Sequence, residues 1–338
     1  MRLPEYFSTF GWLVRDTFKQ SLATRIFWIL LGISVLCIVV CASVTITGDQ
    51  TLAAPGENPD FLPRLDPEAK ETHKIKESGV TAVAGGEVSF AFGAVQVPLA
   101  RDARSAVHFL QLLLAGGVAD TMGLLLTLVW TAGFLPGFLD PRSVSVLLAK
   151  PAPRWCLLLG KYVGVLAFVL LHAVIFVGGT WLALGLRTGV WDTSYLWSVP
   201  LLLLHFAIFF SFSLLLAVCT RSTVVCVFGS IAFWALCWGL NYGRHALATA
   251  AYETPGSVIS SRMTWLADAA YWLLPKPADL GMLLFDKLDA DNYFGRLLDV
   301  SALQHAGHFS FELSVLSSLA FTAYLLVASA RQFATTDY

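Results

Sequence analysis

Six stretches of this sequence are apolar over about twenty residues, and they constrain its fold more than any other feature. A helix of that length is enough to cross the hydrocarbon core of a bilayer. The six stretches lie at Ile26–Ile46, Val118–Gly137, Trp155–Leu184, Val199–Val218, Thr223–Leu240 and Phe309–Ala330. Only 13% of the 338 residues are charged, against roughly 25% in a soluble domain. The sequence therefore predicts an all-α integral membrane protein with six transmembrane helices.

The second apolar segment, Val107–Phe138, is longer than one span requires. Its first half contains the pair Gly116-Gly117 and the charged Asp120. We therefore place the span itself at Val118–Gly137, with Asp120 near its outer end.

Residues 1–25 precede the first span and have the spacing of an amphipathic helix. Their apolar residues recur at helical intervals: Leu3, Tyr6, Phe7, Phe10, Leu13, Val14 and Phe18. The charged Glu5, Arg15, Asp16 and Lys19 lie off that stripe. The pattern predicts an interfacial helix lying along the membrane surface; a soluble helix that binds a partner is the alternative.

Basic residues predict the orientation of the spans, because the short loops on the cytoplasmic side carry most Lys and Arg. The segments on one side contain Arg2, Arg15, Lys19, Arg25, Arg142, Lys150, Arg154, Lys161, Arg221 and Arg331. The short loop Leu186–Ser198 on the other side contains only Arg187. Residues 26–338 are thus expected to form a six-span domain with both termini cytoplasmic, outer loops at 47–106 and 241–308, and a cytoplasmic loop at 138–155.

The two outer loops carry weaker signals of local structure. Val80–Val97 alternates loosely between apolar and polar residues, which is consistent with a short β-hairpin. In the second loop, Trp265–Leu274 and Asp279–Phe285 are amphipathic on either side of Pro275-Lys276-Pro277. We expect short helices there, lying on the outer membrane interface.

The loop at 138–155 has the features of a short, rigid cytoplasmic helix. Asp140 is a good N-cap, and Pro141 suits the first helical position. The helix is expected to include Val144 and Leu147 and to end before Pro151. Its basic neighbours are Arg142, Lys150, Arg154 and Lys161. A plain basic loop, as found in any multi-pass protein, is the alternative.

The amino-acid sequence of this region, with LLAKP followed by PRW and LLLGKY, resembles the coupling-helix region of ABC-2 type transporter permeases, especially the bacterial NosY-like branch. Many members of that family have Glu followed by Gly-Thr where this chain has Asp140-Pro141. The resemblance implies an exporter subunit of a bacterial-type plasma membrane that pairs with a second permease subunit. It also implies that Asp140, Arg142, Val144, Leu147, Lys150 and Arg154 contact a separate ABC ATPase subunit.

The sequence contains no nucleotide-binding loop of its own. A P-loop requires G-x-x-x-x-G-K-[ST], and the one Gly-Lys pair, Gly160-Lys161, is followed by Tyr162 at the start of a span. ATP and Mg²⁺ are therefore expected on a partner subunit, with no cofactor on this chain. The net charge of −1 and the lack of a basic stripe argue against nucleic acid as a partner, and no hydrolase motif suggests an enzyme.

Asp120, His172 and His205 are ionisable residues placed at membrane depth within the predicted spans. Ionisable groups at membrane depth are costly and often functional, which makes them candidates for a transport path. Neutral histidines can also simply bond to a neighbouring helix. If the three act together, the alternative function is that of an ion-coupled secondary transporter.

Two weak metal-site patterns complete the candidates. Cys37 and Cys41 share a helical face, and thiolates can bind a soft metal; small buried hydrophobic residues are the simpler interpretation of all six cysteines. His305, His308 and Glu312 have the spacing of three ligands on one helical face. We assign no metal to either set.

Overall fold

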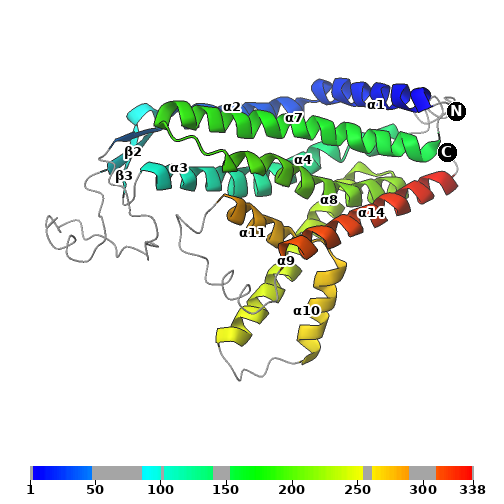
Figure 1. Cartoon of the computed structure of the whole chain (residues 1–338). Coiled ribbons are helices and arrows are strands. Elements are labelled where there is room, and N and C mark those ends of the chain that lie inside the picture. Colours follow the sequence, from blue (N-terminus) through cyan, green and yellow to red (C-terminus); the bar gives the residue numbers. More distant parts are fainter. Residues whose placement is uncertain are drawn as a thin grey trace.

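A computed structural model describes residues 3–47, 86–99, 103–139, 153–253, 261–288 and 310–336 of the chain (Figure 1). Six helical segments in these ranges are long and apolar enough to span a membrane: Arg25–Ser43, Ala106–Phe138, Arg154–Thr188, Ser194–Thr220, Thr223–Leu247 and Phe311–Thr335. The prediction of a six-span, all-α membrane protein is confirmed.

The described ranges contain the following helices. They are α1 (Leu3–Ala23), α2 (Arg25–Ser43), α3 (Ala103–Leu112), the π-helix η3 (Leu113–Gly123), α4 (Leu124–Thr131), α5 (Phe134–Phe138), α7 (Arg154–Thr188), α8 (Ser198–Thr220), α9 (Thr223–Glu253), α10 (Ser261–Leu273), α11 (Pro277–Lys287) and α14 (Phe311–Thr335). Two short 3₁₀ turns, η2 (Ala91–Gly93) and η4 (Ser194–Trp197), complete them.

Helix α7 is the axis of the bundle, and α1 and α2 pack along successive halves of it (Figure 1). Two glycines of α7 allow this close approach. A Cβ atom at Gly164 would lie 2.8 Å from the hydroxyl oxygen of Thr17 in α1, and one at Gly179 would overlap Ile38 in α2. Small residues serve this purpose in membrane proteins, because van der Waals packing rather than hydrophobic burial joins helices there.

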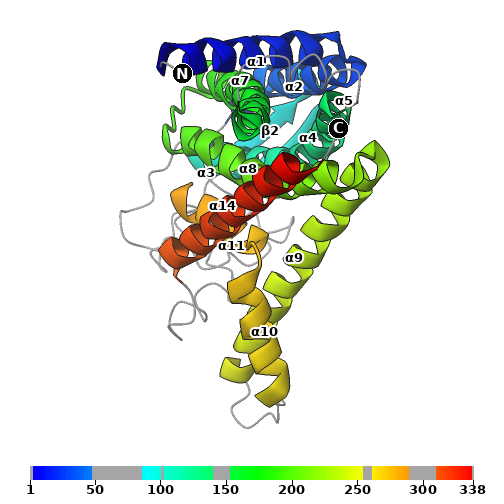
Figure 2. The same ribbon diagram turned by 90° about the vertical axis from the view of Figure 1, so that its right-hand side faces the viewer.

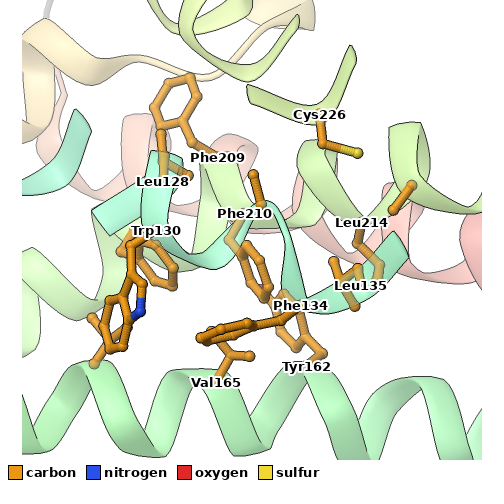
Figure 3. Packing of buried hydrophobic residues seen from close by; sticks show 14 of the residues in the cluster. Leu128, Trp130, Phe134, Leu135, Tyr162, Val165, Phe209, Phe210, Leu214 and Cys226 are labelled. Atoms are coloured by element: carbon orange, nitrogen blue, oxygen red, sulfur yellow. The ribbon is translucent and has the colours of Figure 1, made fainter. Parts of the chain in front are cut away.

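Aromatic side chains from α4, α5, α7 and α8 form the interior of the bundle (Figure 3). The rings of Tyr162 and Phe210 stack with centroids 5.5 Å apart, and Trp130 meets Phe134 edge-on at 5.6 Å. The indole nitrogen of Trp130 donates a hydrogen bond to Thr24, the one extended residue between α1 and α2. This bond fixes the point at which α1 gives way to the first span.

The second membrane segment begins earlier than the sequence suggests. We placed its span at Val118–Gly137, whereas the continuous helical segment begins at Ala103 and includes Gly116-Gly117. Residues Leu113–Gly123 are a π-helix, and the hydroxyl of Thr121 donates to the carbonyl five residues earlier. The sequence pattern alone does not show whether this helix begins near Val118 or begins at Ala103 and continues through a π-helical segment. Such π segments are uncommon and frequently mark functional sites.

A small sheet closes one end of the bundle. Strands β1 (Thr45–Thr47), β2 (Gly86–Phe90) and β3 (Val95–Leu99) are antiparallel in that order, with Ile46 opposite Val88 and Val88 opposite Val97. The hairpin expected within Val80–Val97 is present, with strands at residues 86–90 and 95–99.

Helix α9 continues to Glu253, beyond Leu240, where the sequence indicated the end of its span. With α10 it projects from the bundle, as both views show (Figures 1 and 2). Helices α10 and α11 correspond to the two amphipathic segments predicted in this region. The start of α1 and the end of α14 lie at the same end of the bundle, opposite the sheet (Figure 1).

Candidate functional site

Most of the predicted coupling helix lies outside the described residues. Asp140, Arg142, Val144, Leu147 and Lys150 fall within residues 140–152, so their arrangement stays a prediction. The two ends of this segment are described: α5 and its cap residue Leu139 precede it, and α7 follows it. Both flanks make contacts that bear on how the segment is held.

Arg154, the first residue of α7, contacts the end of α14. Its Nη1 atom donates to the backbone carbonyls of Ala334 and Thr336 at 3.2 and 2.9 Å, and lies 3.4 Å from that of Phe333. The last carbonyls of a helix have no partner within the helix and favour a cation. Arg154 thus joins the start of α7 to the last turn of α14.

Lys161, two turns into α7, joins three elements at the same end of the bundle. Its side chain is buried, with 1% exposed, and its Nζ donates to Gln20 Oε1 of α1 at 2.6 Å. Asp16 Oδ2, also on α1, lies 3.8 Å away, and the Phe138 ring of α5 lies 5.8 Å away. This lysine therefore contacts α1 and the last residue of α5, immediately before the predicted coupling segment.

Two of the three intramembrane candidates contact each other. Asp120 is on the π-helix η3 and His205 is on α8, and Asp120 Oδ1 lies 2.6 Å from His205 Nδ1. The His205 side chain is 2% exposed and that of Asp120 14%. The pair links the irregular second segment to α8, the helix with the largest buried share.

His172 lies at a different place, in the wall of a cavity. Its Nε2 is 3.2 Å from the hydroxyl oxygen of Ser34 in α2. The cavity has a volume of about 180 Å³, is open at one side and is lined by residues of α2, η3, α4, α7 and α8. Its lining is formed by Leu30, Ile33, Ser34, Val118, Ala119, Met122, Gly123, Leu124, Leu126, Thr127, Val169, His172, Ala173, Phe176, Leu202 and Phe206. Asp120 and His205 are sequence neighbours of lining residues but do not line it.

The most densely bonded polar group was not anticipated as a site. Asp279 at the start of α11 is 1% exposed. Its Oδ1 accepts from Asn241 at 2.9 Å and lies 2.6 Å from His245 Nε2, both on α9. Its Oδ2 accepts from the Tyr271 hydroxyl of α10 at 2.7 Å and from Ser314 of α14 at 2.5 Å. One carboxylate thus joins α9, α10, α11 and α14.

The pKa values in this cluster follow from burial and from the bonds. Burial raises the pKa of Asp279, but the bond and charge of His245 and the Ser314 and Tyr271 bonds bring it below its usual value. Burial, together with a smaller effect of the Arg244 charge, lowers the pKa of the Lys276 amine to about 8 despite the nearby Asp279 charge. Lys276 Nζ donates to the Ser317 hydroxyl at 2.5 Å and lies 4.6 Å from the centre of the Tyr271 ring. Asn241 and His245, one turn apart on α9, were the available sequence signal for this cluster.

The two metal-site patterns gain no support from the described residues. Within those ranges, no group of three or more His, Cys, Asp or Glu side chains is placed to hold a metal ion. Cys37 and Cys41 are free thiols on α2. His305 and His308 lie outside the described residues, and Glu312 is in the first turn of α14.

A family model described as "ABC-2 family transporter protein" matches residues 12–337 of the chain. No curated protein matches it.

Proposed function

Because the chain belongs to the ABC-2 transporter family, we propose that this membrane permease component of an ABC transporter serves an ATP-driven exporter. In this proposal, a separate ABC ATPase subunit binds at Asp140–Lys150 and hydrolyses ATP there. Two permease subunits, identical or different, work with two ATPase subunits. The spans then move a substrate outward across the membrane.

The contacts at the base of the coupling segment are the observation that carries this proposal. Arg154 bonds the start of α7 to the end of α14, and Lys161 contacts α1 and the last residue of α5. A force applied to residues 140–152 would act on α5 and α7 directly. It would reach α1 and α14 through two short polar contacts, so four elements would move together.

The same proposal assigns the cofactor and the orientation. ATP and Mg²⁺ bind to the partner, since this sequence lacks a P-loop and its one Gly-Lys lysine, Lys161, is buried against Gln20. The ATPase is cytoplasmic, so the end of the bundle with Arg154 and the last turn of α14 faces the cytoplasm of a bacterial-type plasma membrane. The sheet and helices α10 and α11 then lie outside.

An ion-coupled secondary transporter is the second candidate, and the Asp120–His205 pair favours it. A buried carboxylate bonded to a histidine at 2.6 Å is a common element of proton pathways in membranes. His172 contacts Ser34 on a different helix and does not extend this pair. The permease function is therefore the better supported of the two.

Co-purification from the native host tests the proposal. The wild-type chain, solubilised in mild detergent, should bring down an ATPase with measurable turnover. Asp140→Ala/Arg142→Ala should reduce the affinity for the ATPase about tenfold or more, because a loss of about 1.4 kcal/mol of interface free energy corresponds to a tenfold weaker complex.

A matched control removes one acid and one base at the other end of the bundle. Asp286→Ala/Lys287→Ala changes an exposed pair on α11 and should leave the recovered ATPase unchanged. If no ATPase accompanies the wild type and the chain alone accumulates substrate in liposomes on a proton gradient, the secondary transporter is correct instead.

A further inference from the structure

We propose that the π-helix η3 is a conformational switch held by the bond between Asp120 and His205. When this bond breaks, part of η3 becomes α-helical, and the outer part of the second membrane segment turns relative to the inner part. The inference deepens the proposed function and rests on it in one respect, because the ATPase supplies the movement that breaks the bond. The two forms of η3 themselves do not require the ATPase.

Helix η3 is the irregular part of a continuous helical segment, with α3 before it and α4 after it. Its bonds reach the carbonyl five residues earlier, as in a π-helix. The N–H of Leu124 donates to the carbonyl of Ala119, and the hydroxyl of Thr121 donates to that of Gly116 at 3.0 Å. Most π-helices are single turns, whereas η3 has 11 residues. A rare conformation of this length requires contacts that hold it.

Gly123 is one residue that permits the π form. A Cβ atom at this position would lie 3.2 Å from the carbonyl oxygen of Val118, five residues earlier. That oxygen belongs to the backbone, so it cannot turn aside as a flexible side chain would. Gly117, in the same π-helix, has no such restriction, because a Cβ atom there would meet the Leu113 side chain at an ordinary 3.5 Å.

The bond between Asp120 and His205 joins η3 to α8. Asp120 Oδ1 lies 2.6 Å from His205 Nδ1, and the imidazole is almost completely buried. The other ring nitrogen, Nε2, is also buried and has no hydrogen-bond partner among the described residues. Within the part of the chain that the structure describes, Asp120 is thus the hydrogen-bonding partner that orients this ring.

This bond and the π form depend on each other. Leu128 of α4 is packed in the same buried cluster as Phe209 of α8, so α4 is fixed relative to α8 (Figure 3). The turns between Asp120 and α4 then determine where the carboxylate points. Each residue of an α-helix turns by about 100° about the axis. A shift by one residue on conversion to α-helix would therefore turn Asp120 away from His205 by about that angle.

The switch connects the cytoplasmic end of this segment to the cavity. Helix α4 leads to α5, which ends at Phe138, immediately before the predicted coupling segment. A displacement of these helices along α8 would pull Asp120 from His205. Four residues of η3 line the cavity: Val118, Ala119, Met122 and Gly123. Conversion of η3 would thus rebuild one wall of the cavity when the ATPase acts.

The test measures a distance across η3. Leu113 and Leu126 lie at its two ends and are 52% and 42% exposed. Spin labels are attached to Leu113→Cys/Leu126→Cys in a chain whose six native cysteines are replaced by alanine. The labelled permease, diluted with unlabelled permease, is reconstituted with its co-purified ATPase in lipid nanodiscs. Trapping with ATP, Mg²⁺ and vanadate should add a second distance that differs by about 3 Å, because one residue of α-helix adds about 1.5 Å of rise and about 100° of turn.

Three variants of the labelled permease, measured without ATPase or nucleotide, examine the switch directly. His205→Phe keeps an aromatic ring but removes the bond, and should populate the second distance. Gly123→Ala places a methyl group against the Val118 carbonyl and should do the same. Gly117→Ala is the matched control, since it makes the same substitution in the same helix without that contact, and should keep the first distance. Gly123→Ala decides the question if His205→Phe fails to fold.

Each outcome has one meaning. A single unchanged distance in both His205→Phe and Gly123→Ala overturns the switch. A second distance in these variants but none in the vanadate-trapped wild type overturns the ATPase as its driver. If no ATPase co-purifies, the proposed exporter function fails, whereas the variants of the permease alone still decide the switch.

Discussion

The Nη1 atom of Arg154 lies 2.9 Å from the carbonyl oxygen of Thr336, so the residue that begins α7 holds the residue that caps α14. These residues are 182 positions apart in the sequence, yet they meet beside the predicted coupling segment. Through this contact, the last helix of the chain, α14, is directly connected to the site where the ATPase is proposed to act.

Replacing Arg154 should therefore weaken both the stability of the permease and its coupling to the ATPase. Arg154→Ala removes the donor for the carbonyls of Ala334 and Thr336. Because hydrogen bonds to charged groups contribute about 1.5–3 kcal/mol, we expect a fall in melting temperature of several degrees in detergent and a loss of substrate-stimulated ATPase turnover. Arg154→Lys should recover part of both, since its ammonium keeps a positive charge and N–H donors near these carbonyls on a differently shaped head group.

The control for this variant is Arg187→Ala, at the exposed far end of the same helix. It should leave both the melting temperature and the stimulated turnover unchanged. An Arg154→Ala protein with normal stimulated turnover would show that α14 is not driven through this contact.

Lys161 should hold α1 on α7. Lys161→Met fills nearly the same volume but leaves Gln20 Oε1 without its 2.6 Å donor, whereas Asp16, with half its side chain exposed, can turn to water. We expect a loss of about 1–3 kcal/mol, and a faster reaction of a cysteine placed at Thr17, which is buried against α7. Thiol labelling kinetics measure this; unchanged labelling with Lys161→Met would mean that the α1–α7 packing alone is sufficient.

The spans were predictable because hydropathy is a local property of each segment. The apolar runs and the prolines define where helices cross and where they stop, so the six spans and the short turn at Thr220–Ser222 follow from the sequence. The extension of α9 beyond Leu240 does not, because Asn241 and His245 are polar in sequence and find their partner only through Asp279 on α11.

Candidate residues were predictable by type but not by partner. Asp120, His172 and His205 stand out because ionisable groups are rare at membrane depth. Only the three-dimensional structure pairs Asp120 with His205 and places His172 against Ser34 instead. Asp279 gave no such signal, since an acidic residue near the start of an amphipathic helix is ordinarily a solvated one.

The Asp120–His205 pair should be coupled energetically. A double-mutant cycle with Asp120→Ala, His205→Ala and the combined variant isolates the interaction between the two side chains. We expect each single change to destabilise the protein by about 2–4 kcal/mol and the double change to cost less than their sum by about 1–3 kcal/mol. The measurement is unfolding by SDS titration in mixed micelles. Strict additivity would show that each residue is held by other contacts.

Asp279 should be the most sensitive single residue outside the spans. Asp279→Ala leaves the polar groups of Asn241, His245, Tyr271 and Ser314 without their shared acceptor, and we expect a loss of about 3–5 kcal/mol. Asp279→Asn keeps one acceptor oxygen and should lose about half as much. Asp286→Ala on the same helix, 43% exposed in its side chain, is the control and should cost little.

Acid should act through the same carboxylate. Its folded-state pKa is below the ordinary value of 3.8, so its contribution is complete above about pH 4 and is lost as the pH falls through the folded value. The Asp279→Asn protein should therefore lose less stability between pH 5 and pH 3 than the wild type does. Equal losses over that interval would assign acid sensitivity to other carboxylates.

Lys276 should have the opposite effect on stability, at alkaline pH. Burial lowers the pKa of its amine from 10.5 to about 8, so between these values the unfolded state binds a proton that the folded state does not. Stability contributed by this group therefore rises with pH from about 8 to about 10.5 and is constant below 8. The difference amounts to about 3 kcal/mol at 1.36 kcal/mol per pKa unit.

Lys276→Met removes this titration and keeps the aliphatic stem beside Tyr271. The change in unfolding free energy that it causes should therefore be more stabilising at pH 7 than at pH 10. The comparison of unfolding free energies at the two pH values, each as variant minus wild type, removes the contributions of other titrating groups. Lys287→Met, on an exposed lysine of α11, should have a pH-independent effect. If the effect of Lys276→Met is also independent of pH, the amine is charged in the folded protein at pH 9, and its bond to Ser317 is a charge-assisted one.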